Sequence, residues 1–415
     1  MNQRAMNKMK RGRFLLGAVS GLTVAANADS LFARALAQQP LAGAGAGAAG
    51  RILVVLNMQG GNDGLNTIVP HGLEAYYRYR PTLAVSRGEA LRIDDTIAFN
   101  PAMRSLKDMY DAGKVAIVQG AGYPKPDHSH FRSTQIWQTA APETFESTGW
   151  VGRYLDRSGV SKKDLFSGVA IAQVLPELMV GNATDVPAIS DVHGYGLYSD
   201  KRADSRGTLS SLVFDQRAGL TSPYLQRVAE IEAHAQLGSE ELPRLVSGYK
   251  TTASYPATAL GRSLALAAQI AGSNLGTRVI YVQHGSFDTH VSQRGTHERL
   301  LREMSDALKA FYDDLAAHGL DGSVLTMTFS EFGRRVAENA SHGTDHGEAG
   351  PMLLIGGGVK GGVYGEHPSL DRLDAGDAVY TTDFRSVYTT VLERWLARPA
   401  QGIIAGSYPT LPLLG

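Results

Sequence analysis

The sequence predicts an α/β protein in which helices cover both faces of a doubly wound, largely parallel sheet. The first observation is a set of apolar runs, rich in β-branched residues, that are typical of strands buried on both faces. These runs span residues 51–58, 114–120, 277–285, 323–333 and 351–358. The second is a helical spacing of apolar side chains over 296–319, between the third and fourth runs. The third is the resulting order of strand, helix and strand, which favours parallel pairing.

The remaining elements follow from local signals. The helix over 296–319 ends at Gly319, a residue type that commonly stops helices. A closing helix is expected over 383–397. The segment 160–260 mixes short apolar runs with polar stretches, and we expect it to be an insertion or a lid. The apolar face of the helix expected over 296–319 is formed by Leu300, Met304, Leu308, Phe311 and Leu315.

Length and composition set the outer limits. The chain has 415 residues, 40 basic and 40 acidic residues, and no cysteine. A chain of this length can bury a large core in one domain or in several. Zero net charge gives no global attraction to nucleic acid or to an anionic membrane, so we expect neither as a partner. The absence of cysteine excludes disulfides, thiolate metal sites and a cysteine nucleophile.

The N-terminus has the order of an export signal. A basic stretch is followed by a short apolar stretch and then by small residues around Ala35 and Ala37. Residues 1–37 are therefore predicted to be a signal peptide, residues 38–50 a Gly/Ala linker, and residues 51–415 the folded domain. The alternative is an amphipathic N-terminal helix of the mature fold. The predicted location is periplasmic or secreted, with no stable membrane span after signal cleavage.

The sequence leaves the export route open between the Sec system and the twin-arginine system. The stretch KRGRFLL resembles the twin-arginine signal, which exports folded proteins. Gly12 separates Arg11 from Arg13, where that signal has adjacent arginines.

Groups able to do chemistry fall next to the ends of the predicted strands. In a parallel sheet the carboxyl ends of the strands meet at one edge, where open α/β sheets bind their ligands. Mixed Asp, Glu and His side chains suit a divalent ion such as Zn or Mn. The residues are Asp63 after the first strand, Ser129 and His130 after the second, Asp288 and His290 after the third, Glu331 after the fourth, and Asp345 and His346 in the loop that enters the fifth.

A series of motifs resembles one family, the domain of unknown function 1501. The motifs, in chain order, are GGNDGLNTIVP, HSHFRSTQIWQT, GWVGRYLD, FDTH, SEFGRRVAEN, GTDHG and DFRSVYTTVLERW. The resemblance covers Arg51 to about Leu396. The family consists of exported bacterial proteins related to the alkaline phosphatase and sulfatase superfamily. The resemblance implies an alkaline-phosphatase-like sheet, one or two metals at strand ends, and a nucleophile at a helix N-terminus. The chemistry that it implies is hydrolysis or transfer of phosphate or sulfate esters.

The resemblance implies a role for each matching position. Asp63 stands at the first-strand metal ligand, and Ser129 stands near the nucleophile. Glu331 falls where an Asp–His pair is expected, and Phe332 replaces the histidine, which leaves open whether a second metal binds. The candidate ligands, for one or two ions of Zn, Mn or a similar metal, are Asp63, Asp288, His290, Glu331, Asp345 and His346.

A mechanism follows from this interpretation. A metal at Asp63 would lower the pKa of Ser129 and polarise a phosphoryl or sulfuryl oxygen of a small or polymeric ester. His130 would protonate the leaving oxygen. The candidate substrate-binding residues are Asn62, Arg132 and Arg334, the two arginines because a guanidinium matches the equatorial oxygens.

Each position also has a purely structural interpretation. Asp63 can be a turn residue, and Ser129 can be an N-cap. His290 can pack at the start of its helix, and Glu331 can pair with a nearby arginine at the surface. For the whole protein, the alternative is a non-catalytic binding or assembly protein of the cell envelope that acts with an exported partner.

Overall fold

The computed structural model describes residues 50–159, 165–190, 242–244, 246–273 and 275–415. Nearly all of them belong to one compact unit, Ala46–Ser190 with Val246–Gly415. The predicted signal peptide, all of the linker except Gly50, and residues 191–241 of the predicted insertion lie outside the described residues. Among the described helices, none combines the length and apolar character that a bilayer crossing requires.

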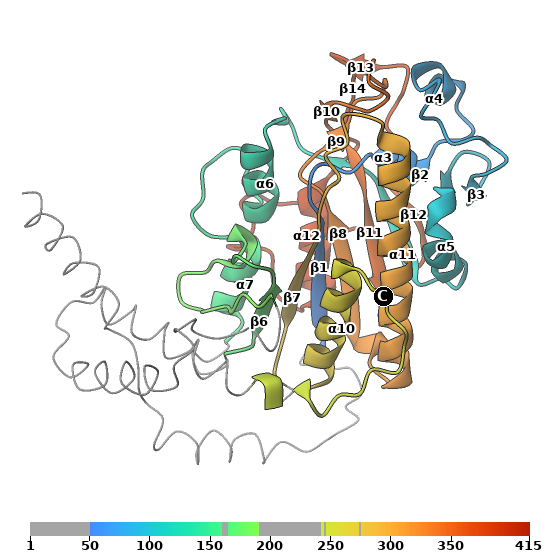
Figure 1. The fold of residues 1–415 in the computed structure, drawn as a ribbon. Helices are drawn as coiled ribbons and strands as arrows, with labels where there is room; N and C mark the ends of the chain where they lie inside the picture. The colour runs from blue at the N-terminus through green and yellow to red at the C-terminus, as the bar shows by residue number, and fades with distance from the viewer. Residues whose placement is uncertain (1–49, 160–164, 191–241, 245, 274) are drawn as a thin grey trace, which may run out of the picture. The chain divides into compact units, whose positions relative to one another are not determined.

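The unit is built on a mostly parallel eight-stranded sheet (Figure 1). Its order is β12–β5–β11–β8–β1–β7–β6, and β15 also pairs with β5. All pairs are parallel except those of β11, which runs antiparallel to β5 and β8. The strands are β1 (Ile52–Met58), β5 (Val115–Gly122), β6 (Gly168–Ile171), β7 (Val279–His284), β8 (Val324–Phe329), β11 (Gly350–Gly356), β12 (Gly362–Tyr364) and β15 (Thr382–Asp383).

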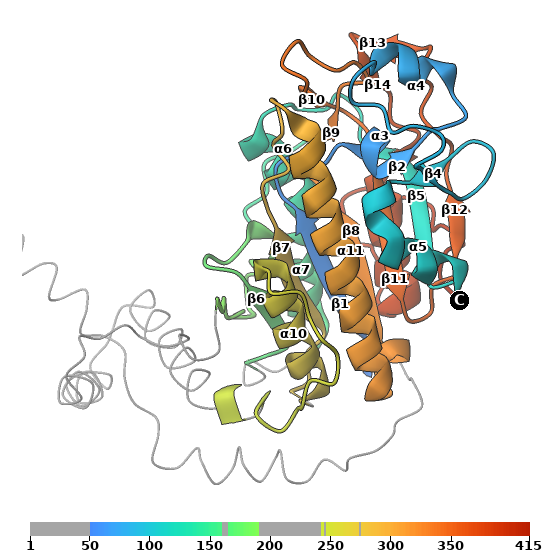
Figure 2. The same ribbon diagram turned by 45° about the vertical axis from the view of Figure 1, so that its right-hand side comes forward.

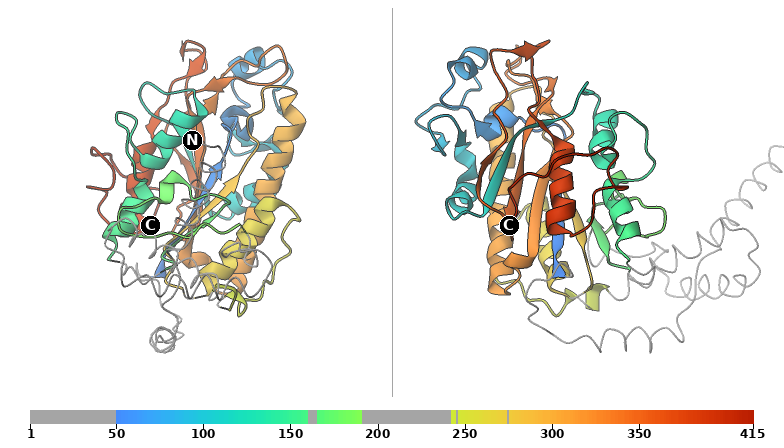
Figure 3. Two further views of the ribbon diagram at one scale, coloured as in Figure 1. Left: turned by 60° about the vertical axis from the view of Figure 1, so that its left-hand side comes forward. Right: turned by 180° about the vertical axis from the view of Figure 1, so that it is seen from behind.

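Helices cover both faces of this sheet. Figure 2 shows α5, α10 and α11 together on one face, and Figure 3 shows α12 on the other face together with α6 and α7. The long helices are α5 (Arg104–Asp111), α6 (His130–Thr139), α7 (Trp150–Arg157), α10 (Ala259–Gly272), α11 (Gln293–Ala317) and α12 (Phe384–Thr390), which continues as a π-helical turn η5 (Val391–Trp395).

Short elements connect these layers. The helical ones are α3 (Gly64–Thr67), α4 (Glu74–Tyr79), η2 (Pro101–Met103), η3 (Glu177–Met179) and η4 (Asp321–Ser323). The extended ones are β2 (Ile68–Val69), β3 (Leu91–Arg92), β4 (Ala98–Phe99), β9 (Gly333–Arg334), β10 (His346–Gly347), β13 (Leu373–Asp374) and β14 (Asp377–Ala378).

The strands are apolar throughout because both faces are buried. Leu53 and Val55 of β1 join a core cluster with Trp137 of α6 and Tyr388 of α12. Successive strand side chains point to opposite faces. The residues between these two, such as Val54, are equally buried and face the helices on the other side. Each strand therefore lacks the alternation of a half-exposed strand.

The predicted fold class is confirmed, and so are the five strands and the two helices expected from the sequence. The structure adds β6, a four-residue edge strand inside the range expected to be an insertion. Residues 165–190 thus contribute to the sheet. Four apolar residues are too few for a periodicity signal, and for this reason the pattern did not reveal β6.

Candidate metal centre and adjoining cavity

Loops from five adjacent strands, β5, β11, β8, β1 and β7, meet at one edge of the sheet. Asp288 follows β7, Glu331 follows β8, and His130 opens α6 after β5. His346 belongs to β10, which precedes β11. Because β11 is antiparallel, its entry lies at the edge where its neighbours end. The single reversed strand therefore brings His346 to the carboxyl ends of the parallel strands.

Three imidazoles face one carboxylate at this edge. The Nε2 atoms of His290 and His346 lie 2.8 and 3.2 Å from Oδ1 of Asp288. Nε2 of His130 lies 3.4 Å from Oδ2 of the same residue. Ligand atoms of His130, Asp288 and His346 all lie within 4.8 Å of one another, which is compact enough to hold one ion.

The opposite nitrogen of each ring is held by an oxygen acceptor. In the tautomer that carries the ring proton on Nδ1, each neutral ring presents a lone pair at Nε2, on the side of Asp288. Metal-binding histidines are oriented by outer partners in this way. The three contacts are His130 to Glu331 Oε1 at 3.1 Å, His290 to Asp345 Oδ1 at 3.2 Å, and His346 to the His128 carbonyl at 2.7 Å.

In this tautomer the lone pairs of two rings face each other. Nε2 of His290 and Nε2 of His346 are 3.0 Å apart. Arg334 Nη1 also donates toward His290 Nε2, at 3.4 Å, which again requires a lone pair on that atom. Burial lowers the pKa of His346, so protonation does not readily relieve the contact. A cation fits these residues.

The charges around the rings favour a divalent ion. Burial raises the pKa of Asp288, but hydrogen bonds from Arg334 and His346 outweigh it and bring the pKa to about 2. Hydrogen bonds, first from Asn339, lower the pKa of Asp345. Asp288 and Asp345 therefore bring negative charge to the three rings, which suits a cation.

Glu331 and Phe332 contact the histidine rings of the candidate metal centre. The Glu331 side chain is 3% exposed and accepts from Gly60 N at 2.7 Å as well as from His130. It makes no ion pair with Arg334, unlike the surface pair considered from the sequence; Arg334 pairs with Asp288. The Phe332 ring centroid lies 4.3 Å from that of His346 and 4.9 Å from that of His130. Phe332 therefore packs against two of the three imidazoles.

The GGNDG turn serves close packing rather than an open ligand site. Gly60 and Gly61 have φ values of 115° and 79°. A Cβ on Gly60 would lie 2.5 Å from the backbone nitrogen of Asp288, and one on Gly61 would overlap the Phe332 ring. The two glycines therefore let the chain approach the loop after β7 and the residue after Glu331.

Asp63 lies in this turn but is committed to the protein interior. It is 0% exposed and receives Arg80 Nη1 at 2.6 Å, Gln293 Nε2, and Asn66 N at 3.4 Å. Burial raises the pKa of Asp63, but the Arg80 guanidinium and its other donors outweigh this and hold it below the usual value. The structure thus gives Asp63 a salt bridge and a cap on α3, and it is not one of the residues around His346.

Two other predicted residues are also used internally. Asn62 is buried and hydrogen-bonded to Thr67 and His297. Arg334 is buried and donates to the carbonyls of Gly61 at 2.6 Å and Thr344 at 2.8 Å, besides Asp288. Both are thus engaged within the protein, unlike the substrate-binding roles expected from the sequence.

Ser129 and Arg132 flank the start of α6. Ser129 occupies the N-cap position with an exposed side chain that makes no cap hydrogen bond. Arg132 donates to Gln135 at 2.7 Å and to the Thr144 carbonyl at 2.9 Å, and it stacks over Phe145. Neither residue lines the cavity beside the metal centre.

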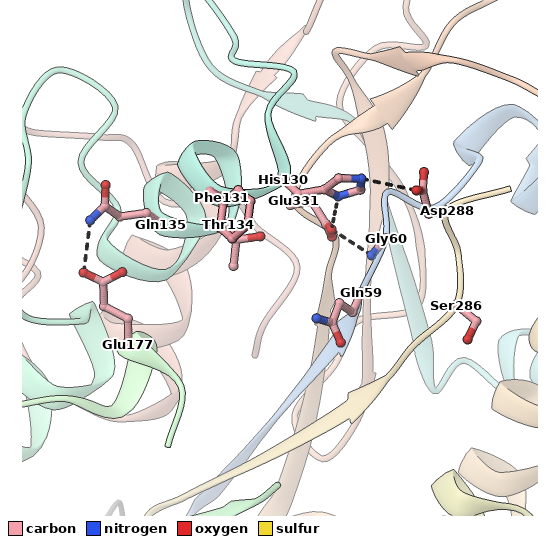
Figure 4. A pocket seen from close by; sticks show the side chains of 10 residues that line it. All are labelled: Gln59, Gly60, His130, Phe131, Thr134, Gln135, Glu177, Ser286, Asp288 and Glu331. Atoms are coloured by element: carbon pink, nitrogen blue, oxygen red, sulfur yellow. Dashed lines mark hydrogen bonds and ion pairs between the residues drawn. The ribbon is translucent and has the colours of Figure 1, made fainter. Parts of the chain in front are cut away.

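That cavity has a volume of about 470 Å³ and opens beside Asp288 and Glu331. Figure 4 shows α6 on one side and the loop after β1 on the other, with His130 and Glu331 between them. This volume falls in the usual range of ligand sites, about 300–1,000 Å³. The lining residues are Gln59, Gly60, His130, Phe131, Thr134, Gln135, Glu177, Ser286, Asp288 and Glu331.

Several of these residues were not singled out from the sequence. Thr134, Gln135 and Glu177 have no motif of their own, and only the fold brings η3 beside α6. The buried partners of Asp63 and Asn62 could have been found from a pattern in the sequence. Gln293 and His297 stand four residues apart, and they continue the buried stripe of α11 toward its N-terminus. Polar residues on such a stripe indicate a buried network.

The comparisons with known proteins agree with the motif series. The family model described as "Protein of unknown function (DUF1501)" matches residues 217–394, and over this part of the chain the resemblance expected from the motifs is confirmed. A search of curated proteins finds no match.

Solved structures similar to the chain include the following three. One is a protein in the alkaline phosphatase superfamily from Vibrio parahaemolyticus, with 11% identity, TM-score 0.39, and coverage of 88% of this chain and 70% of that one. Another is a 2-O GAG sulfatase, with 9% identity, TM-score 0.34, and coverage of 86% and 73%. The third is the alkaline phosphatase of the Antarctic bacterium TAB5, with 12% identity, TM-score 0.34, and coverage of 76% and 94%. The function proposed below is built on the site geometry.

Removal of Asp63 should damage stability more than metal binding. Asp63→Ala leaves the buried Arg80 cation without its carboxylate, so we expect a loss of roughly 3–5 kcal/mol in the free energy of unfolding, measured by urea denaturation. Folded Asp63→Ala protein should still bind metal. Unchanged stability together with lost metal would instead identify Asp63 as a ligand.

The buried His297 should make the protein sensitive to acid. Burial lowers its pKa from 6.5 to about 4, although Asp63 partly offsets this. The neutral ring is thus favoured in the folded state, and its contribution is complete above pH 6.5 and lost as the pH falls toward 4. His297→Gln should remove on the order of 3 kcal/mol of this pH dependence.

The measurement is the free energy of unfolding from pH 7 to pH 4, with a chelator present so that metal binding does not contribute. His342→Gln, at an exposed histidine, is the control and should follow the wild type. Parallel curves for His297→Gln and wild type would contradict the assignment.

Proposed function

For a chain with the motifs and family model of DUF1501, we propose a metal-dependent hydrolase, or transferase, that acts on phosphate or sulfate esters. One divalent ion of the Zn or Mn type would be held by His130, Asp288, His290 and His346. The observation that supports this most is the pairing of three anchored Nδ1 atoms with three Nε2 atoms directed at one carboxylate. In this proposal the candidate ligands expected from the sequence fall into two groups, because Glu331 and Asp345 orient rings instead of binding the ion.

The ion, when bound, supplies a Lewis acid that polarises an ester oxygen. The chain supplies the proton acceptor and the hydroxyl groups. Glu331 is the carboxylate that holds the His130 Nδ1 proton and also lines the cavity, so it can receive a proton from an attacking group. His130 is thus a ligand in this proposal, and not the general acid expected from the sequence.

The nucleophile is one of three hydroxyl groups or water. Ser129 directly precedes His130 and is exposed, but it does not line the cavity. Thr134 and Ser286 do line it. Ser286 has φ 77°, an uncommon conformation for a residue with a side chain, and such conformations gather at functional sites.

We further propose that the chain acts outside the cytoplasm, in the periplasm or as a secreted protein. The signal-like N-terminus supports this. A metal centre built only from histidine and carboxylates, with no cysteine in the chain, is compatible with an oxidising compartment.

Metal content should follow the assigned roles. Purified protein should contain about one ion per chain, measured by mass spectrometry, because ligand atoms of His130, Asp288 and His346 lie close enough together to hold one ion. Asp288→Asn and His346→Gln should lose it. Asp345→Asn, which affects only the outer partner of His290, should weaken metal affinity by about 10–100-fold. His342→Gln is the matched control and should retain the metal.

Activity is measured on 4-nitrophenyl phosphate and 4-nitrophenyl sulfate, with and without a chelator. Loss of activity with the chelator and recovery on adding the metal would support the proposal. Ser129→Ala and Thr134→Val then distinguish the nucleophiles. Protein that retains its metal after Asp288→Asn, or that never contains one, contradicts the metal centre.

A further inference from the structure

We propose that the cavity beside the metal centre binds the neutral, hydroxyl-rich part of a saccharide ester, with one sugar ring stacked on Phe131. This rests on the proposed function and names its substrate class. The metal would take the charged ester group, and the remaining cavity walls would take the sugar.

The cavity walls away from the metal are polar but carry no positive charge. Gln59, Thr134, Gln135 and Ser286 offer amide and hydroxyl groups, and Glu177 offers a carboxylate. The side chains of Gln59 and Thr134 make no hydrogen bond to any described residue. Unpaired amides and hydroxyls at the wall of a cavity are suited to hydroxyl groups, which both donate and accept.

Positive charge is absent from the lining. No Arg or Lys is among the residues that line the cavity in the described part of the chain. Arg334 pairs with Asp288 and donates to loop carbonyls. Arg132 donates to Gln135 and to backbone carbonyls, and it stacks over the Phe145 ring. A ligand with several anionic groups, such as a nucleotide, would therefore lack partners beyond the metal.

Phe131 supplies the apolar surface that a sugar ring needs. Its side chain is 92% exposed, although it lies in the first turn of α6 next to His130. A pyranose ring has an apolar C–H face and a polar edge. The phenyl face can cover the first, while the amides and Glu177 bind the second.

Part of this surface is already held in place. Gln135 receives Arg132 Nη1 at 2.7 Å and donates to Glu177 at 3.3 Å. Figure 4 shows this pair on the α6 side of the cavity and Gln59 on the opposite side. Fixed side chains lose little entropy on binding, and two walls of hydrogen-bonding groups match a ring whose hydroxyls point outward.

The test separates the sugar subsite from the metal. Asp288→Asn protein, in which the metal centre is disabled, is titrated with maltotriose, cellotriose and chitotriose, and with adenosine monophosphate as an anionic probe. Binding is followed by saturation-transfer NMR. At least one trisaccharide should bind and the nucleotide should not. Phe131→Ala in the same background should weaken trisaccharide binding by about tenfold or more.

Phe145→Ala is the matched control. That ring is 80% exposed but lies outside the cavity lining, so its removal should leave binding unchanged. Failure of every trisaccharide to bind, equal effects of the two Phe variants, or binding of the nucleotide would overturn the proposal.

The metal content of the wild-type protein is measured separately. Metal without sugar binding rejects only the saccharide subsite, and sugar binding without metal rejects only the hydrolase.

Discussion

The buried guanidinium of Arg334 is the constraint on which the site depends. It donates to carbonyls of Gly60 and Gly61 after β1, of Phe287 after β7 and of Thr344 before β10, and it pairs with Asp288 at 2.7 Å. A planar cation with five donors can satisfy several diverging carbonyls at once. Three loops from distant parts of the chain are therefore held at fixed separations, and the histidines that two of them carry are held with them.

Topology then determines which loops that guanidinium can reach. The site draws on β5, β11, β8, β1 and β7, which are consecutive in the sheet. Only β11 is antiparallel, and its reversal places the segment before it, with Asp345 and His346, at the edge where its neighbours end. A parallel β11 would have put this segment at the far edge of the sheet.

The sequence predicts the strands well because burial on both faces leaves a continuous apolar run. It also brings the correct loops to one edge, since parallel strands share their carboxyl ends. It cannot distinguish a ligand from an orienting residue. Whether Glu331 binds an ion or holds His130 depends on which ring nitrogen faces it, at 3.1 Å. Asp63 shows the same limit, because its role is set by Arg80 and Gln293, one of which is 230 positions away.

Two aspartate–arginine pairs show how the exposure of the carboxylate distinguishes a structural salt bridge from one at a candidate binding site. In Asp63–Arg80 both side chains are 0% exposed, and the carboxylate oxygens are filled by donors of the chain. Such a pair has no capacity left for a ligand. In Asp288–Arg334 the guanidinium is equally buried, but the carboxylate is 44% exposed, and imidazoles surround it. The Arg334 charge therefore holds the loops. In the proposed hydrolase, the positive charge opposite the ester group would come from an ion beside Asp288.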